Sequence, residues 1–260
     1  MTQSESHKEQ LERDGVTVLP EVFSPQEVET IRHDLTATLA AGAQGEAAIH
    51  GETGGLYAAR NVLALWPGAA HVWRQSRLLA ILAELLGRAF GLVRVLFFDK
   101  PPDQSWALPW HKDTTIAVSD NRRPSTRFAK PTRKAGVPHV DAPVEVLQTM
   151  LTARIHLDDV TEENGPLKVI PGSHHSGKVL ALGNTAPVSV LAQCGDVLLM
   201  RPLVIHCSNR SRPGNSRHRR ILHLEFAATP ELPDGYTWHT FLAAFPFVQA
   251  TAVSLQPAVE

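Results

Sequence analysis

The stretch that decides the expected fold and site is Trp110-His111-Lys112-Asp113-Thr114, which has a counterpart far downstream in Val204-Ile205-His206-Cys207-Ser208. Side chains two residues apart on a strand point to the same face, so His111 and Asp113 can hold one ion together. A third ligand must come from a neighbouring strand, and His206 follows an apolar run that predicts one. An isolated His-x-Asp pattern also arises by chance, as a surface histidine beside charged residues. The prediction of a metal site therefore depends largely on His206 and the basic residues that follow it.

Two imidazoles and one carboxylate on one face of a metal leave three adjacent positions open, which is the arrangement of non-heme Fe(II) oxygenases. A 2-oxo acid cosubstrate would chelate such a metal and needs a cation for its distal carboxylate, which a guanidinium binds bidentately. Among the arginines that follow the distal histidine, the candidates are Arg217, Arg219 and Arg220, which lie 11, 13 and 14 residues beyond it. Arg219 is favoured because strand alternation places it on the same face as His223 and Glu225. A solvated basic hairpin is the alternative, and it is expected for Arg210, Arg212 and at least one of the three candidates.

Short apolar runs separated by Gly, Pro, Asn or Asp fill the chain after residue 91, and this pattern predicts a β-sandwich or barrel. The runs cover 92–98, 151–157, 167–170, 188–191, 197–200, 203–205 and 220–226. The segment 171–175 is predicted to be a turn, where a structural role for His174 is favoured over metal ligation.

Two of these strands have one apolar face and one face rich in ionisable groups. In 150–157 the ionisable face includes Arg154 and His156, and in 219–226 it includes Arg219, His223 and Glu225. Since strand side chains alternate, the apolar faces can pack on helices while the polar faces line a pocket.

Helices are predicted near the start of the chain. Ser24-Pro25-Gln26-Glu27 has the pattern of a capping box with proline at the first helical position. A second helix is predicted over about 69–86, ending at Gly87. The segments 43–61 and 119–146 are predicted to be loops, the longer one a lid or substrate loop.

The composition is that of an ordinary globular protein, with 260 residues, 43% hydrophobic and 20% charged residues and a formal net charge of −1. This charge balance predicts neither a nucleic-acid nor a membrane partner. The two cysteines, Cys194 and Cys207, do not make a disulfide framework, and the polar residues 1–9 contain no apolar signal core, so a cytoplasmic location is expected.

The chain resembles the phytanoyl-CoA dioxygenase family of Fe(II)/2-oxoglutarate oxygenases. The resemblance covers residues 92–226 and includes Phe98-Asp99-Lys100-Pro101-Pro102, Trp110-His111-Lys112-Asp113, Asn164-Gly165-Pro166-Leu167 to Pro171-Gly172-Ser173-His174, His206-Cys207-Ser208 and Arg219-Arg220-Ile221-Leu222-His223-Leu224-Glu225-Phe226. It implies a mainly β fold, a double-stranded β-helix or jelly-roll barrel flanked by N-terminal α-helices. The expected organisation is one domain over 1–260, with a helical part over about 1–90, a jelly-roll core over about 91–228, a lid loop over about 119–146 and an extension over 229–260.

The resemblance also implies roles for single residues. The iron ligands would be His111, Asp113 and His206, and the side chains in contact with 2-oxoglutarate would be Ser208, Arg219, Arg154 and Leu96. In many relatives the anchoring arginine is 11 residues after the distal histidine, which would be Arg217. The longer match of the following strand favours Arg219 and implies a hairpin two residues longer.

The implied reaction consumes Fe(II)-bound O2 and 2-oxoglutarate, yields succinate and CO2, and hydroxylates an unactivated C–H bond of a small-molecule substrate. Candidate substrate contacts are Lys100, Lys134, His139 and Arg60. Two alternatives remain open: a cupin-like zinc hydrolase or isomerase, which would not need Arg219 and Ser208, and a non-catalytic binding protein on the same barrel.

Overall fold

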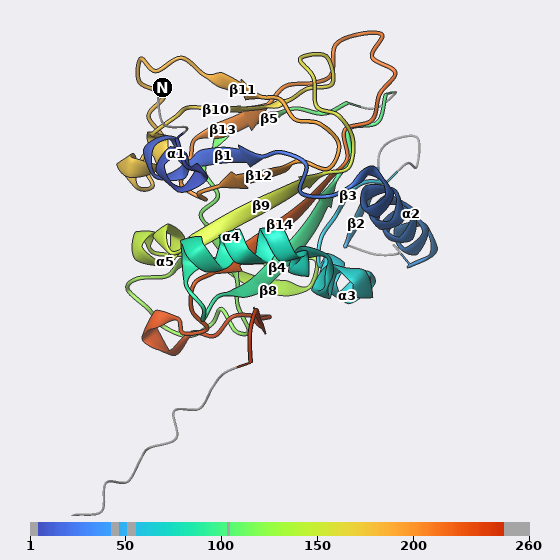
Figure 1. Ribbon diagram of the computed structural model, residues 1–260. Coiled ribbons are helices and arrows are strands. Elements are labelled where there is room, and N and C mark those ends of the chain that lie inside the picture. The colour runs from blue at the N-terminus through green and yellow to red at the C-terminus, as the bar shows by residue number, and fades with distance from the viewer. Residues whose placement is uncertain (1–4, 43–46, 51–55, 103–104, 247–260) are drawn as a thin grey trace, which may run out of the picture.

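The computed structural model describes residues 5–42, 47–50, 56–102 and 105–246 (Figure 1). Its larger sheet is antiparallel and has the order β1-β12-β9-β14-β4-β3-β2, with β15 also paired to β4. The strands are β1 (Val16–Leu19), β2 (Ala48–His50), β3 (Leu56–Ala59), β4 (Gly91–Phe98), β9 (Met150–His156), β12 (Val197–Met200), β14 (Ile221–Ala227) and β15 (Leu242–Ala243).

Two smaller antiparallel sheets complete the β structure. One faces the larger sheet and has the order β11-β10-β13-β5, made of β5 (Leu108–His111), β10 (Leu167–Val169), β11 (Val188–Val190) and β13 (His206–Ser208). The other has the order β6-β8-β7, made of β6 (Thr115–Ala117), β7 (Ala129–Lys134) and β8 (Val137–Asp141).

Helices cover the outer face of the larger sheet (Figure 1). They are α1 (His7–Asp14), α2 (Pro25–Gly42), α3 (Val62–Leu65) and α4 (Ser76–Leu86), and α5 (Val144–Gln148) lies beside β9. The apolar faces predicted for β9 and β14 pack into this core, and Trp73, Phe90 and Phe226 meet there edge to face with ring centroids 5.4 to 6.0 Å apart. Burial of this aromatic cluster is a large contribution to holding helices and sheet together.

The predicted start of α2 is confirmed, because Ser24 and Glu27 exchange side-chain to backbone hydrogen bonds. The helix predicted over 69–86 is divided instead into two 3₁₀ turns and α4. Gln75 has an extended backbone and its side chain accepts from the Leu78 N–H, so the regular helix begins only at Ser76. It ends at Gly87, as predicted, where φ is 80°.

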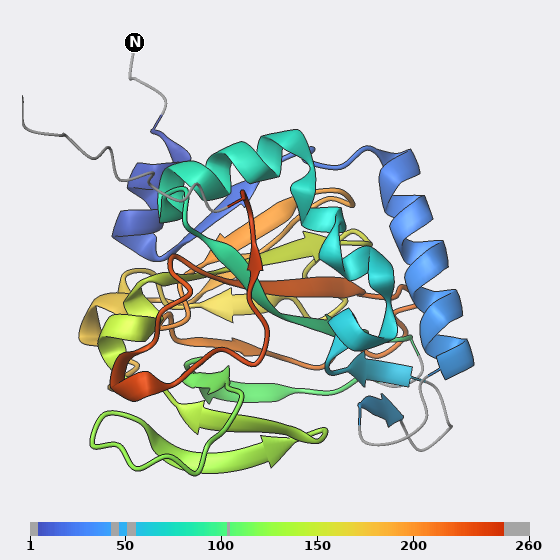
Figure 2. The ribbon, with the colours of Figure 1, turned by 90° about the horizontal axis from the view of Figure 1, so that it is seen from below.

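The segment 119–146 is not the loop that the sequence predicts, since it contains the hairpin of β7 and β8 (Figure 2). The hairpin turns at Ala135 and Gly136, whose φ values of 49° and 78° fit a two-residue turn that needs positive φ at both positions. Strand β7 is an exposed edge strand that contains Pro131. Proline is tolerated at such an edge, and the absence of a buried face removes the alternating pattern that would reveal a strand.

Three smaller expectations also differ from the structure. The predicted loop 43–61 contains β2 and β3, with residues 43–46 and 51–55 outside the described part. The apolar run 203–205 is a turn, and strand β13 begins at His206. Strand β1, from the part expected to be helical, pairs with β12 at the edge of the larger sheet.

Gly195→Ala is expected to destabilise the protein by about 3 kcal/mol, which combines the cost of a positive φ with that of overpacking. Gly195 has a φ of 95°, and a Cβ there would lie 2.2 Å from the Phe23 carbonyl oxygen. The Phe23 N–H also donates to the Gly195 carbonyl at 3.0 Å, so the two backbones cannot separate freely. Urea denaturation measures the loss. Gly183→Ala is the control, because φ is 57° there but nothing lies within 4 Å; equal losses in both variants would contradict the steric argument.

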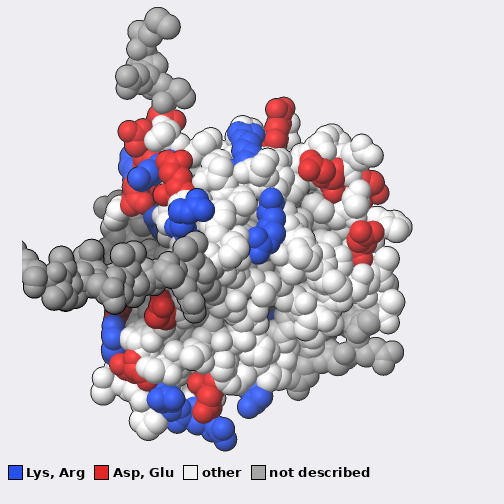
Figure 3. Space-filling model, turned by 60° about the horizontal axis from the view of Figure 1, so that its bottom comes forward, with Lys and Arg blue, Asp and Glu red and all other residues white. Residues whose placement is uncertain are grey.

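On the face shown in Figure 3, Lys and Arg side chains lie interspersed with Asp and Glu side chains, in keeping with the formal net charge of −1. Among the described residues, none of the helices combines the length and the apolar character needed to cross a bilayer.

Candidate functional site

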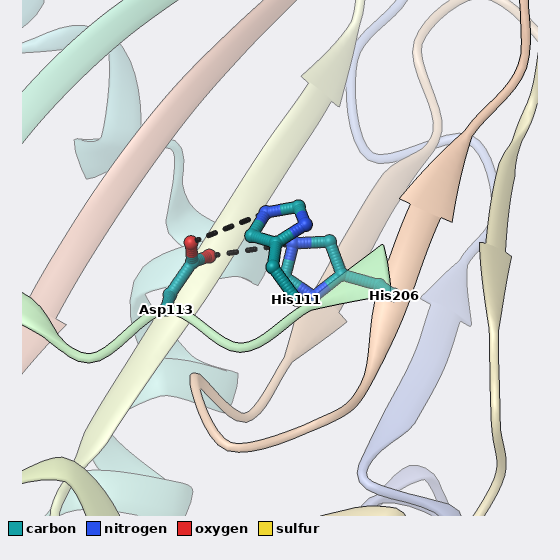
Figure 4. Close-up of side chains that lie close together, drawn as sticks. All are labelled: His111, Asp113 and His206. Carbon is teal, nitrogen blue, oxygen red and sulfur yellow. Dashed lines mark ion pairs between the residues drawn. The ribbon is translucent and has the colours of Figure 1, made fainter. Parts of the chain in front are cut away.

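Three predicted ligands meet on the inner side of the smaller facing sheet (Figure 4). His111 ends β5 and lies directly opposite His206, the first residue of β13, in the antiparallel register. Asp113 lies two residues beyond β5, where its N–H donates to the Pro202 carbonyl at 2.9 Å. Its carboxylate points toward both imidazoles, 3.7 Å from Nε2 of His111 and 3.6 Å from Nε2 of His206.

Both imidazoles are oriented by the backbone. Nδ1 of His111 lies 2.8 Å from the Pro109 carbonyl and Nδ1 of His206 lies 2.9 Å from the Val204 carbonyl. Since a carbonyl only accepts, each Nδ1 carries the hydrogen, and in the neutral ring Nε2 presents a lone pair. Burial lowers the pKa of His206 to about 4, so this ring is neutral at pH 7. One donor atom from each of the three residues lies within 4.8 Å of the others, a set that fits one divalent metal ion.

A cavity of about 290 Å³ lies between the two facing sheets and is bordered by the three ligands. Its opposite wall is the polar face of β9, β14 and β4, as strand alternation predicts. In the register of these strands, His223 lies between Leu96 and Arg154, and Glu225 lies between Arg94 and Thr152.

One end of the cavity is lined by Arg154, Arg219 and Ser208, and buried Lys100 lies behind Ser208; these four residues are called here the cationic pocket. Lys100 is 0% exposed, and its Nζ donates to Ser208 Oγ at 3.1 Å and to two backbone carbonyls. Arg219 is 2% exposed, and its Nε has no hydrogen-bond partner among the described residues.

The electrostatics of the cationic pocket favour an anion. Burial, followed by the charges of Arg219 and Arg154, lowers the pKa of Lys100 to about 6. Burial and the charge of Arg154 lower the pKa of Arg219 to about 9. Within the described ranges, neither arginine of the pocket forms an ion pair with a carboxylate. Buried charges without a counterion are costly, so the pocket is prepared for a ligand that supplies negative charge.

The structure places the three candidate arginines Arg217, Arg219 and Arg220 in different surroundings. Arg217 is exposed, and Arg220 binds Asp158 through two hydrogen bonds of 2.8 and 2.6 Å. Arg219 lines the cavity. The strand alternation that favoured Arg219 therefore agrees with where its side chain lies.

A model of the family described as phytanoyl-CoA dioxygenase (PhyH) matches residues 11–219, more than half of the chain. The chain belongs to the phytanoyl-CoA dioxygenase family. This family member is 33% identical over 110 residues to the L-proline trans-4-hydroxylase of Streptomyces griseoviridis. The aligned region covers 42% of this chain and only 33% of the relative's length.

Solved structures with the same fold include EctD from S. alaskensis with bound Fe, at a TM-score of 0.65 and 21% identity over 85% of this chain and 75% of that one. They also include the non-heme alpha ketoglutarate dependent epimerase SnoN from nogalamycin biosynthesis, at a TM-score of 0.62 and 18% identity over 85% and 79% of the two chains. The mainly β jelly-roll fold predicted for this family member is confirmed.

Other predicted site residues also border the cavity: Leu96, Arg60, Lys134 and His139. Lys100 was predicted to contact substrate, but it lies buried behind Ser208 and is not among the described residues that line the cavity. His174 is not among the ligands, and its Nε2 lies 3.1 Å from the Glu12 carbonyl.

Sequence reasoning listed neither His223, Glu225 nor Arg94 as a site residue, yet all three line the cavity. Alternation had placed His223 and Glu225 on the polar face of their strand. Arg94 had a signal as well, since it is the lone charged residue in the apolar strand Gly91–Phe98. An arginine within a buried strand needs a polar environment, which the cavity provides.

Proposed function

We propose that this protein is an Fe(II)- and 2-oxoglutarate-dependent dioxygenase that hydroxylates a C–H bond of a small-molecule substrate. The observation that carries the proposal is the presence, in one cavity, of a His-Asp-His ligand set and a separate cationic pocket. A 2-oxo acid with a distal carboxylate needs both. EctD, which has the same fold, is described with bound Fe and with 2-oxoglutarate and 5-hydroxyectoine.

Each part of the site has a defined task in this proposal. The residues His111, Asp113 and His206 would hold the iron, which supplies the oxidation of a C–H bond by O2. One oxygen atom enters the substrate and the other enters succinate, while 2-oxoglutarate loses its 1-carboxylate as CO2. Arg219 and Ser208 would bind the distal carboxylate, with Lys100 donating to Ser208 from behind, which orients the cosubstrate toward the ligand set.

The two other functions fit the cavity less well. A zinc hydrolase or isomerase would use the same three ligands, but it gives no reason for buried Arg219 to lack a counterion. A binding protein on this barrel would not need both Nε2 atoms held toward one carboxylate.

The proposal is tested by adding Fe(II) and then 2-oxoglutarate to metal-free protein without oxygen. The expected result is a weak visible charge-transfer band, followed by slow succinate formation without substrate once O2 is admitted. Folded protein that binds metal yet gives neither band nor succinate would move the assignment to the zinc or binding-protein function.

Binding of 2-oxoglutarate is expected to weaken as the pH rises above 6, by up to about tenfold per pH unit. The pKa of Lys100 is about 6 without ligand, so its amine is mostly neutral at pH 8. A bound carboxylate favours the ammonium form, so binding at pH 8 takes up a proton. Calorimetry in two buffers of different ionisation enthalpy measures this uptake. Lys100→Met should remove it, and an affinity of the unmodified protein that does not change between pH 6 and 8 would refute the argument.

A further inference from the structure

A second group of charged side chains lies around the cavity, apart from the cationic pocket. It consists of Arg60, Arg94, Lys134 and Glu225, and is called here the outer charged group. The pKa of Lys134 is lowered by burial first and then by Arg94 and Arg60, whereas Glu225 and Asp113 act in the opposite direction. These charges are therefore close to one another. The group holds three cations and one carboxylate, since Asp113 belongs to the metal ligands.

The donors of the outer charged group are not saturated by the protein. Arg94 Nη2 lies 2.9 Å from Glu225 Oε1, but its Nε is buried and has no partner among the described residues. Lys134 Nζ likewise forms no hydrogen bond or ion pair within the described ranges. A guanidinium and an ammonium with free N–H groups that border the same cavity are suited to a carboxylate.

Two acceptors lie beside these donors. Nδ1 of His139 is 2.9 Å from the Val137 carbonyl, so it carries the hydrogen and Nε2 is an acceptor on a ring that lines the cavity. Burial lowers the pKa of His139 to about 4, which keeps the ring neutral. Glu225 uses Oε1 for both Arg94 and His223, which leaves Oε2 as the second acceptor.

The β7–β8 hairpin is attached where it presents two of these residues. Lys134 ends β7 next to the turn, and His139 lies on β8. The Asn61 side chain donates to the Ala135 carbonyl at 2.9 Å, which ties the turn to the segment before α3. The hairpin thus closes one side of the cavity with a cation and an acceptor.

We propose that the substrate is a free amino acid, with its carboxylate between Arg94 and Lys134 and its ammonium group near Glu225 and His139. This inference rests on the proposed function and names its substrate class. The cavity of about 290 Å³ must hold the cosubstrate and the reacting part of the substrate, and it lies at the lower limit of about 300 Å³ for small-molecule sites. An amino acid fits this limit, and it supplies a carboxylate for Arg94 and Lys134 and an ammonium group for Glu225 and His139.

The test is a panel of free amino acids, including L-proline, with matched carboxylic acids that lack the amino group and matched amides that lack the carboxylate. We expect one or more amino acids to raise succinate formation at least tenfold above the rate without substrate and to gain one oxygen atom by mass spectrometry. The matched acid and amide should each lose most of this stimulation. Equal stimulation by either analogue, or stimulation by no amino acid, would overturn the assignment.

Variants locate the binding site. Lys134→Met is expected to raise the KM for the stimulating amino acid at least tenfold. Lys130→Met is the matched control on the same strand, where the side chain is 80% exposed, and its KM should stay unchanged. An unchanged KM in Lys134→Met would overturn the placement of the carboxylate. A panel without stimulation, in protein that still shows the charge-transfer band and slow succinate formation, would reject the amino-acid substrate alone, whereas loss of both signals would reject the proposed function.

Discussion

Alanine in place of His206 is expected to remove Fe(II) binding and to lower 2-oxoglutarate-dependent succinate formation by roughly 1000-fold or more. Loss of a hydrogen-bond partner of a metal ligand costs about 10- to 100-fold, and loss of a ligand should exceed that. His206 is 2% exposed and is oriented by the Val204 carbonyl, so alanine removes a ligand that the fold holds in place. Anaerobic calorimetry with Fe(II) measures the binding, and succinate assay measures the turnover.

The matched control for this variant is His174→Ala. His174 is the histidine that the Pro-Gly-Ser-His turn made a second candidate, and its ring contacts the Glu12 carbonyl instead of the cavity. Its replacement should leave metal binding unchanged. Retention of Fe(II) with the original affinity in His206→Ala would show that the metal is held elsewhere, and the proposed site would be wrong.

Arg219→Glu is expected to abolish measurable use of 2-oxoglutarate. Truncation of one partner in a buried charge pair costs about 2 to 5 kcal/mol, or roughly 30- to 4000-fold in affinity, and the reversed charge adds repulsion of the distal carboxylate. The side chain is 2% exposed, so solvent does not weaken the effect. The readouts are the anaerobic charge-transfer titration with 2-oxoglutarate and the Kd for Fe(II). A zinc hydrolase would keep its activity in this variant, which separates the two enzyme functions.

Arg217→Glu is the control with the same change in charge. Arg217 is exposed, and it lies at the distance from the distal histidine at which many relatives have the anchoring arginine. Comparison of the Arg217 and Arg219 variants therefore also decides which of the two arginines binds 2-oxoglutarate. Because a buried glutamate can prevent folding, Arg219→Gln is measured as well, with thermal unfolding to verify the fold. An affinity for 2-oxoglutarate that falls in Arg217→Glu and not in either Arg219 variant would reverse the assignment.

Alternation along β9 and β14 was readable from the sequence, because it depends only on the period of a strand. This period placed Arg154, Arg219 and His223 on one face and the apolar residues on the helix-covered face. The same reasoning failed for β7, whose six residues are mostly exposed and have no apolar side to mark them. The substrate contact predicted for Lys100 was wrong because its burial cannot be read from its place after a strand and follows from the approach of Ser208 and Gly165.

The sequence by itself determined the chemistry of this protein: the ligand types, the spacing of His111 and Asp113, the side-chain alternation that favours Arg219 and the family to which the chain belongs. Only the tertiary structure decided that His206 lies opposite His111, that Lys100 lies within the cationic pocket, and that Arg94 and the β7–β8 hairpin border the same cavity. The physical reason is the sequence separation of the residues that set each property. Local patterns report which face of an element is apolar, whereas the pairing of distant strands is settled by burial and hydrogen bonding over the whole chain.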